Sequence, residues 1–159
     1  MKVSVILVGA GLGLRMGGPV KKPFMQLHGK PVFLHTLERF SQCDKISETI
    51  LVVSENDIET LCEQWQSNLD TFKVKKIVPG GKRRQDSVYN GLCHTDRNAD
   101  IVLIHDVVRP LIKKEQIEAV INKVKETRAA ILAAPMKATV KEIVSDFCIK
   151  RTVPRNTLW

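Results

Sequence analysis

A glycine-rich stretch followed closely by basic residues is the first feature of this sequence that could do chemistry. The stretch "GAGLGLRMGGPVKKPF", residues 9–24, lies directly behind the apolar run "VSVILV". Glycines allow positive φ and close backbone approach, so their N–H groups can turn toward phosphate oxygens. Arg15 and Lys22 suit triphosphate chemistry, in which two cations flank the phosphorus being attacked. A tight turn with surface cations accounts for the same residues equally well.

The two commonest nucleotide-binding motifs are excluded. A dinucleotide fingerprint GxGxxG would require a glycine at Leu14 or at Met16. A P-loop ends in Gly-Lys-Ser/Thr, whereas Gly18 is followed by Pro19. If this stretch binds phosphate, its glycine loop is neither a dinucleotide-binding fingerprint nor a P-loop.

The segment "IHDVVRP" supplies a carboxylate at the end of an apolar run. Asp106 is well placed there to hold Mg²⁺, which prefers carboxylate and phosphate oxygens, although an aspartate capping the next turn is also common. Arg109 is either a bidentate phosphate donor or one half of a surface ion pair. His105 is expected to be a packed residue, not a base. The segment predicts a magnesium site with an arginine beside it.

A second glycine turn, "PGGKRRQDS", offers groups for a base or a ribose. Gly80 and Gly81 present backbone, and Ser87 presents a hydroxyl. The alternative is a plain glycine turn into a helix, with Asp86 or Ser87 near the helix N-terminus.

Strand-like and helix-like segments alternate along the chain, which predicts an α/β domain with a largely parallel, twisted sheet. All the unusual loops follow strands, and ligands bind at the carboxyl ends of parallel strands. Ser54 is expected to cap the second helix. The predicted strands cover residues 3–8, 48–54, 74–81, 99–106 and 129–135, and the predicted helices cover residues 31–40, 55–69, 83–95 and 113–128.

The last part of the chain, after Met136, departs from the alternation of strands and helices. Residues 138–144 and 147–153 predict two short strands joined by Ser145 and Asp146, a β-hairpin that projects from the domain. The chain then stops at the apolar "PRNTLW", which predicts that it is a C-terminally truncated form of a longer protein. We expect such a form to bind nucleotide yet turn over more weakly than a longer one.

Composition predicts one cytoplasmic domain spanning residues 1–159. No apolar run approaches the length of a membrane span, and no Cys pair or Cys/His cluster has the spacing of a zinc site. The net charge of +8 favours an anionic partner. The basic residues are not interleaved with exposed aromatics, which argues against a nucleic-acid partner.

Six segments together resemble the 2-C-methyl-D-erythritol 4-phosphate cytidylyltransferase family, in order and over essentially the whole chain. They are "GAGLGLRMG…KKPF", "HGKPVFLHTLERF", "PGGKRRQDSVYNGL", "LIHDVVRPLI", "AAPMKATVK" and "RTVPRNTLW". The resemblance implies a Rossmann-like nucleotidyltransferase domain. It also implies transfer of CMP from CTP to the sugar-alcohol phosphate, in non-mevalonate isoprenoid biosynthesis, with Mg²⁺ as cofactor and pyrophosphate as product.

The resemblance also implies roles for individual residues. Arg15 and Lys22 would be catalytic, and Asp106 would bind the metal. Arg109, Thr139 and Arg155 would contact the substrate phosphate, the latter two from an arm at residues 137–155 that is exchanged across a homodimer. The nucleotide would be held by Gly9, Ala10, Gly11, Leu12, Gly13, Gly81 and Ser87.

Alternative functions remain open at this stage. A ribitol 5-phosphate cytidylyltransferase would have a similar loop and "HD…RP" segment, and substrate choice would depend on the arm. There Ala138 replaces the acid that usually precedes the threonine. A non-catalytic nucleotide-binding protein of the same fold is disfavoured by the joint presence of Arg15, Lys22 and Asp106.

Overall fold

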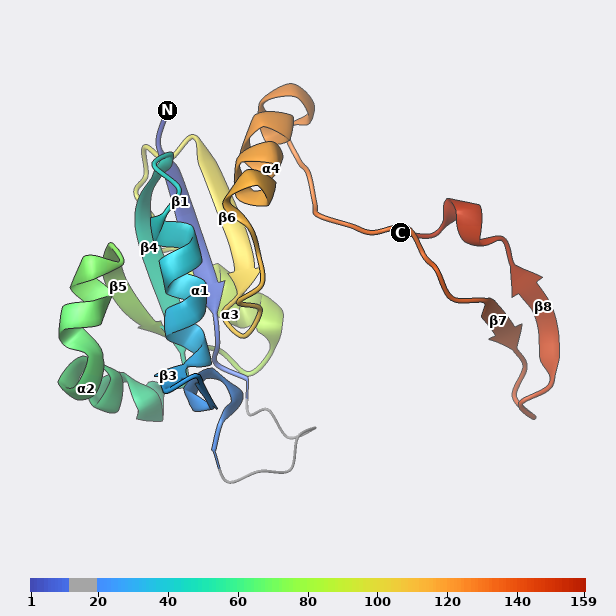
Figure 1. Ribbon diagram of the computed structural model, residues 1–159, viewed down its shortest axis with the longest axis horizontal. Coiled ribbons are helices and arrows are strands. Elements are labelled where there is room, and N and C mark those ends of the chain that lie inside the picture. The colour runs from blue at the N-terminus through green and yellow to red at the C-terminus, as the bar shows by residue number, and fades with distance from the viewer. Residues whose placement is uncertain (12–19) are drawn as a thin grey trace.

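The computed structural model describes residues 1–11 and 20–159 and is built around a twisted parallel sheet (Figure 1). The strand order is β5-β4-β1-β6, and each neighbouring pair is parallel. These strands are β1 (Val3–Val8), β4 (Ile46–Val53), β5 (Val74–Pro79) and β6 (Ile101–Asp106). The predicted α/β class with a largely parallel sheet is confirmed.

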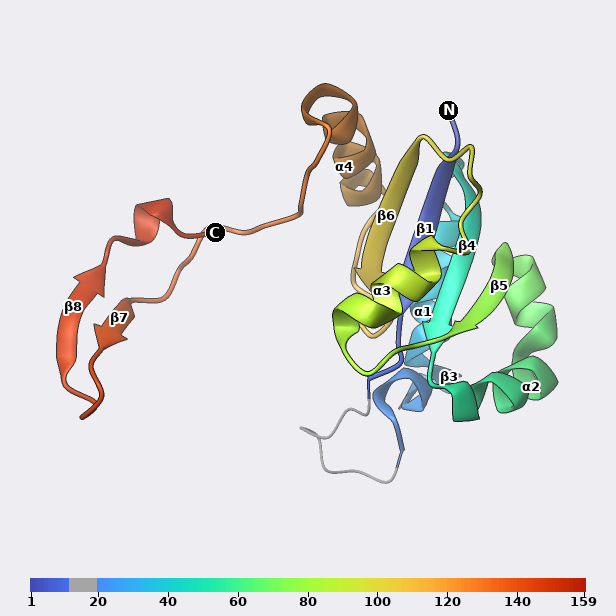
Figure 2. The same ribbon diagram turned by 180° about the vertical axis from the view of Figure 1, so that it is seen from behind.

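Helices cover both faces of the sheet, so the central strand β1 is buried at all six positions. Val3, Val5 and Leu7 join the larger core cluster with α1, α2 and α4, whereas Ile6 and Val8 face α3. Figures 1 and 2 show α1 and α3 on opposite sides of the sheet, with α4 beside β6. The helices are α1 (Val32–Ser41), α2 (Ile58–Thr71), α3 (Arg84–Leu92) and α4 (Lys114–Thr127).

Short elements that were not predicted lead into two of these helices. After a 3₁₀ turn at Lys22–Phe24, the two-residue strands β2 (Gln26–Leu27) and β3 (Lys30–Pro31) form a hairpin before α1. A second 3₁₀ turn, Glu55–Asp57, precedes α2. Within the described residues the Ser54 side chain makes no capping hydrogen bond, so the predicted cap is wrong and the helix begins through this tighter turn.

The predicted strand at residues 129–135 is also wrong. In the part of the chain that the structure describes, residues 129–137 have no regular secondary structure, and Ile131 and Leu132 are exposed. A strand exists only where a neighbour accepts and donates its ladder hydrogen bonds. No described strand lies beside this segment to do so, because the four-stranded sheet ends at β6.

The predicted hairpin arm is present and stands apart from the sheet (Figures 1 and 2). It consists of the antiparallel strands β7 (Val140–Ile143) and β8 (Ile149–Val153), followed by a 3₁₀ turn at Arg155–Thr157. Its apolar side chains Ile143, Phe147 and Ile149 are exposed. Among the described helices, none combines the length and the apolar character needed to cross a membrane.

Candidate functional site

A cleft of about 980 Å³ opens at the carboxyl ends of the parallel strands, where loops after all four strands meet. Its volume is typical of small-molecule sites, which span about 300–1,000 Å³. It is lined by Val8, Gly9, Ala10, Gly11, Lys22, Pro23, Ser54, Glu55, Asn56, Gly80, Gly81, Lys82, Arg83, Arg84, Ser87, Asp106 and Val108.

Two glycines let the loops approach one another on the floor of the cleft. The N–H of Gly9 donates to the Val52 carbonyl at 2.7 Å, and a Cβ at Gly9 would lie 2.5 Å from the Val107 side chain. A Cβ at Gly80 would lie 2.1 Å from the Cβ of Ala10. A real Cβ essentially never makes contacts this short, so a larger residue at either position would force its neighbours to move.

Gly81, in the turn after β5, contacts Ser87 in the first turns of α3. The N–H of Gly81 donates to Ser87 Oγ at 3.0 Å, and that hydroxyl donates to the Arg83 carbonyl at 3.3 Å. Ser87 is 3% exposed, so its hydroxyl chiefly holds the turn in shape. The resemblance implied nucleotide contact by Ser87; Ser87 lines the cleft, and its hydroxyl is also hydrogen-bonded within this loop.

The cleft is electropositive. Lys22, Lys82, Arg83 and Arg84 line it, against two carboxylates, Glu55 and Asp106. Such a balance, together with the glycine backbone of residues 9–11, favours a polyanionic ligand. Arg15, Leu12 and Gly13 lie outside the described residues.

Asp106 ends β6 and lies between two arginines. Arg84 donates from Nε and Nη2 to Asp106 Oδ1 at 3.1 and 2.8 Å, and Arg109 Nε donates to Oδ2 at 2.9 Å. Partial burial by itself raises the pKa of Asp106, but the hydrogen bonds and charges of Arg84 and Arg109 outweigh it and leave the pKa below its ordinary value. The carboxylate is therefore ionised and bound on both oxygens.

Arg84 is the site residue that sequence reasoning missed. It is the first residue of α3 and reaches across the cleft to a residue 22 positions further along the chain. The basic run in "GGKRRQDS" was a usable signal, since basic side chains directly behind a glycine turn are candidates for phosphate contact.

The structure does not bring every predicted residue into this cleft. Arg109 contacts Asp106 but lines a different hollow. Thr139 and Arg155 belong to the arm, which Figure 1 shows away from the sheet, and Arg155 Nη1 donates to the Lys137 carbonyl at 2.9 Å. Within one described chain, the cleft therefore lacks the arm residues.

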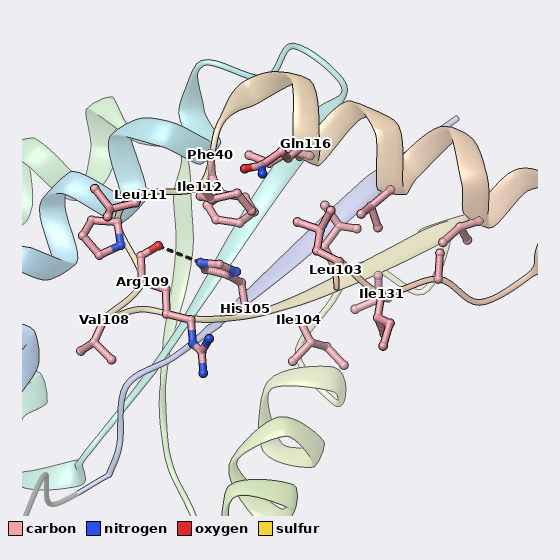
Figure 3. A pocket seen from close by; sticks show the side chains of 17 residues that line it. Phe40, Leu103, Ile104, His105, Val108, Arg109, Leu111, Ile112, Gln116 and Ile131 are labelled. Carbon is pink, nitrogen blue, oxygen red and sulfur yellow. Dashed lines mark hydrogen bonds between the residues drawn. The ribbon is translucent and has the colours of Figure 1, made fainter. Parts of the chain in front are cut away.

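The second hollow, of about 750 Å³, lies between β6 and α4 and is mostly apolar (Figure 3). His105 is its most buried polar side chain; its ring lies 5.0 Å from that of Phe40, and its Nε2 lies 3.0 Å from the Arg109 carbonyl. Burial lowers the pKa of His105, an effect partly opposed by that hydrogen bond and by the charge of Asp106. His105 is a packed residue that ties down the turn behind Asp106, as the sequence predicted.

The lowered pKa of His105 predicts a loss of stability in mild acid. Above the ordinary imidazole pKa of about 6.5, the ring is neutral in both the folded and the unfolded chain, so it contributes no pH dependence. As the pH falls below about 6.5, the unfolded chain takes up the proton first, which lowers the free energy of unfolding. Urea unfolding between about pH 7.5 and pH 5 measures this decline. The decline in the free energy of unfolding will be smaller in His105→Gln, because glutamine keeps an N–H donor but does not titrate. Equal declines in the two proteins would contradict the assignment of the pH dependence to His105.

Comparison with known proteins places this geometry in context. Residues 3–159 match the family described as 2-C-methyl-D-erythritol 4-phosphate cytidylyltransferase. A protein of that name from Alkaliphilus oremlandii is 43% identical over 158 residues, which cover 99% of this chain and 67% of the relative. One from Clostridioides difficile is 41% identical, covering 98% of this chain and 65% of the relative.

Solved structures similar to this chain point to the same family. The crystal structure of 4-diphosphocytidyl-2C-methyl-D-erythritol synthase from Anaerococcus prevotii superposes with a TM-score of 0.82 at 31% identity, covering 98% of this chain and 64% of that one. Another crystal structure of a synthase of that name gives a TM-score of 0.76 at 26% identity, with 99% and 70% coverage. The chain thus spans about two thirds of the length of the proteins it matches.

Proposed function

The chain belongs to the 2-C-methyl-D-erythritol 4-phosphate cytidylyltransferase family, and from that premise we propose that it transfers CMP from CTP to this sugar-alcohol phosphate in non-mevalonate isoprenoid biosynthesis. A phosphate oxygen of the acceptor attacks the α-phosphorus of CTP. The new P–O bond forms as the bond to the bridging oxygen of the leaving group breaks, and pyrophosphate departs. The reaction needs no nucleophile from the protein, so the protein's part is to position the reactants and stabilise charge.

The observation that carries this proposal is the cleft in which the backbone of residues 9–11 meets Lys22 and Arg84. The glycine backbone would hold the triphosphate. Lys22, together with Arg15, would stabilise the charge that develops on the phosphorus under attack. Gly81 and Ser87 would contact the cytidine, and the hydrogen bond between them keeps that loop in shape.

The residues that line the cleft fit a divalent cation that binds together with a nucleotide. Asp106 lines the cleft next to the glycine loop, but the described residues contain no group of three or more metal-ligating side chains. Mg²⁺ characteristically binds through one or two carboxylates plus substrate phosphates and keeps several waters. Asp106 would therefore hold Mg²⁺ jointly with the triphosphate, and the ion would neutralise phosphate charge when bound.

The arm supports a homodimer in which the acceptor site is shared. Thr139 and Arg155 belong to the arm, which Figures 1 and 2 show away from the sheet, and apolar side chains of its hairpin are exposed. Delivery of the arm to the cleft of a second chain would bring both residues to the acceptor phosphate, with Arg109 at the rim. Residues 137–155 would then be the dimerisation and substrate arm.

We expect the protein to act in the cytoplasm. Its four cysteines, Cys43, Cys62, Cys93 and Cys148, are free, and two of them are exposed. Exposed free thiols are typical of a reducing compartment.

Pyrophosphate release tests the proposed reaction. The protein is incubated with CTP and MgCl₂, and with either 2-C-methyl-D-erythritol 4-phosphate or ribitol 5-phosphate, while binding of CTP is measured separately by isothermal titration calorimetry. We expect CTP to bind, and pyrophosphate to appear only with the methylerythritol phosphate. Reactions without acceptor control for hydrolysis of CTP.

Each other outcome selects an alternative. Release with ribitol 5-phosphate alone would assign the paralogous cytidylyltransferase activity. Binding of CTP without release with either acceptor would leave a nucleotide-binding protein that is not a transferase under these conditions. Failure to bind CTP would overturn the proposal.

A further inference from the structure

The two oxygens of Asp106 are already engaged in the nucleotide-free protein. Arg84 places two N–H groups on Oδ1, and Arg109 places one on Oδ2. Counted as formal charges, one carboxylate lies between two guanidinium groups, so this cluster carries a net positive charge. A divalent cation approaching it alone meets repulsion and finds both carboxylate oxygens already accepting hydrogen bonds from arginine.

The two arginines are not equivalent. Arg84 lines the cleft, is 60% exposed, and begins α3 directly behind the glycine turn at Gly80 and Gly81. Arg109 sits on the turn just after Asp106 and lines the apolar hollow instead. Of the two arginines, Arg84 is the one that lines the cleft beside the glycine loops, where the triphosphate would bind.

A triphosphate in the cleft offers Arg84 a stronger partner than Asp106. Guanidinium groups bind phosphate oxygens in a bidentate manner, and a triphosphate carries several negative charges where the carboxylate carries one. The N-terminus of α3 adds favourable potential for an anion at the same place. The Arg84 side chain is exposed and makes its contacts with Asp106 at the edge of the cleft, so it has room to rotate toward another partner.

We propose that Arg84 is an exchangeable counter-ion, which pairs with Asp106 Oδ1 in the free protein and moves to the triphosphate when nucleotide binds, so that Oδ1 becomes available to the divalent cation. The inference rests on the proposed function, because it takes the anionic ligand to be a nucleoside triphosphate. Its consequence is that cation and nucleotide bind together. The free protein would hold the cation poorly and thereby keep Asp106 reserved for the cation–nucleotide complex.

Binding of Mn²⁺ to the nucleotide-free protein tests the first half of the exchange, with free Mn²⁺ followed by electron paramagnetic resonance. Arg84→Gln frees Oδ1, and we expect it to bind Mn²⁺ about fivefold to tenfold more tightly than the parent protein, the range set by a partly exposed, charge-assisted pair. Arg83→Gln is the matched control. Arg83 is the neighbouring residue and pairs with Asp86, not with Asp106. The control variant therefore removes the same charge without freeing Asp106. Equal gains in the two variants, or no gain in Arg84→Gln, would overturn the inference.

Binding of CTP in the presence of EDTA tests the second half. We expect Arg84→Gln to bind metal-free CTP more weakly than the parent protein, and Asp106→Asn, which releases Arg84, to bind it more tightly. Glu55→Gln removes a carboxylate from the same cleft without touching Arg84 and should give the smaller gain. Thermal melts establish that each variant is folded. A gain in Glu55→Gln equal to that in Asp106→Asn would contradict the exchange.

The two measurements separate failure of this inference from failure of the proposed function. If the parent protein binds no CTP while Arg84→Gln still gains affinity for Mn²⁺, the proposed function falls and with it the exchange, leaving only a structural ion pair. If the parent protein binds CTP and the Mn²⁺ affinity does not respond to Arg84→Gln, the proposed function stands and the exchange falls.

Discussion

Replacement of Lys22 by glutamine will lower kcat by about 10²–10³-fold, the cost typical of removing one group that stabilises charge in a transition state. Lys22 begins the 3₁₀ turn at Lys22–Phe24 and lines the same cleft as Arg84 and Asp106. Because glutamine keeps a similar length but carries no charge, the variant tests the cation itself. Steady-state pyrophosphate release gives kcat, and calorimetry gives the affinity for CTP. We expect the affinity to change far less than kcat, since the charge on phosphorus peaks in the transition state.

The neighbouring lysine provides the control for this variant. Lys21 Nζ pairs with Asp57 Oδ1 at 2.6 Å and does not line the cleft. Lys21→Gln therefore removes the same charge one residue away, outside the cleft, and breaks a partly buried ion pair with Asp57. Its kcat should stay near that of the parent protein. Equal losses in the two variants would show that the overall charge of the loop matters, and not the position of Lys22.

Alanine at Gly80 will damage the cleft through sterics alone. The new Cβ would lie 2.1 Å from the Cβ of Ala10 and 3.0 Å from Ser87 Oγ, so the loop after β1 must move away from the loop after β5. Overpacking of this kind costs about 1–3 kcal/mol of stability. A shift of about 1 Å in a positioning group can cost about 10²-fold in rate, so we expect kcat/KM to fall by about that factor. Thermal melts and pyrophosphate release measure the two effects.

Two companion variants make this prediction specific. Ala10→Gly in the Gly80→Ala background removes the clashing Cβ and should recover most of kcat/KM and of the melting temperature. Gly11→Ala adds a methyl group where no atom of the described residues lies within 4 Å, so its melting temperature should not change. If the double variant were no better than Gly80→Ala alone, the close approach of residues 10 and 80 would not be the cause of the damage.

Much of the fold followed from local sequence patterns. The apolar run at residues 3–8, broken only by Ser4, predicted a strand, and helical periodicity located the four helices of the described residues to within a few positions. Alternation of the two kinds of segment predicted parallel strands, and this in turn predicted that the loops after them would meet. These inferences succeed because the pattern of apolar residues within a segment indicates which of its positions are buried.

The errors fall where the outcome depends on a distant neighbour. Residues 129–135 have the apolar character of a strand, yet strand formation requires a hydrogen-bonded partner, and the described sheet supplies none there. Ser54 has the right residue type for a helix cap, but the 3₁₀ turn at Glu55–Asp57 takes the place of that cap. In both cases local propensity was overridden by the surrounding chain.

The sequence by itself determined the class of the protein: an α/β chain with glycine turns, cations and a carboxylate at the ends of its strands, in the order that the cytidylyltransferase family shares. Only the tertiary structure decided which of these groups act on one another. It brought Arg84 to Asp106 across 22 residues, turned the Ser87 hydroxyl inward, and left Thr139 and Arg155 on an arm away from the cleft. The physical reason is that an ion pair or a shared cleft is a contact between segments, and its existence depends on the path of the backbone between them.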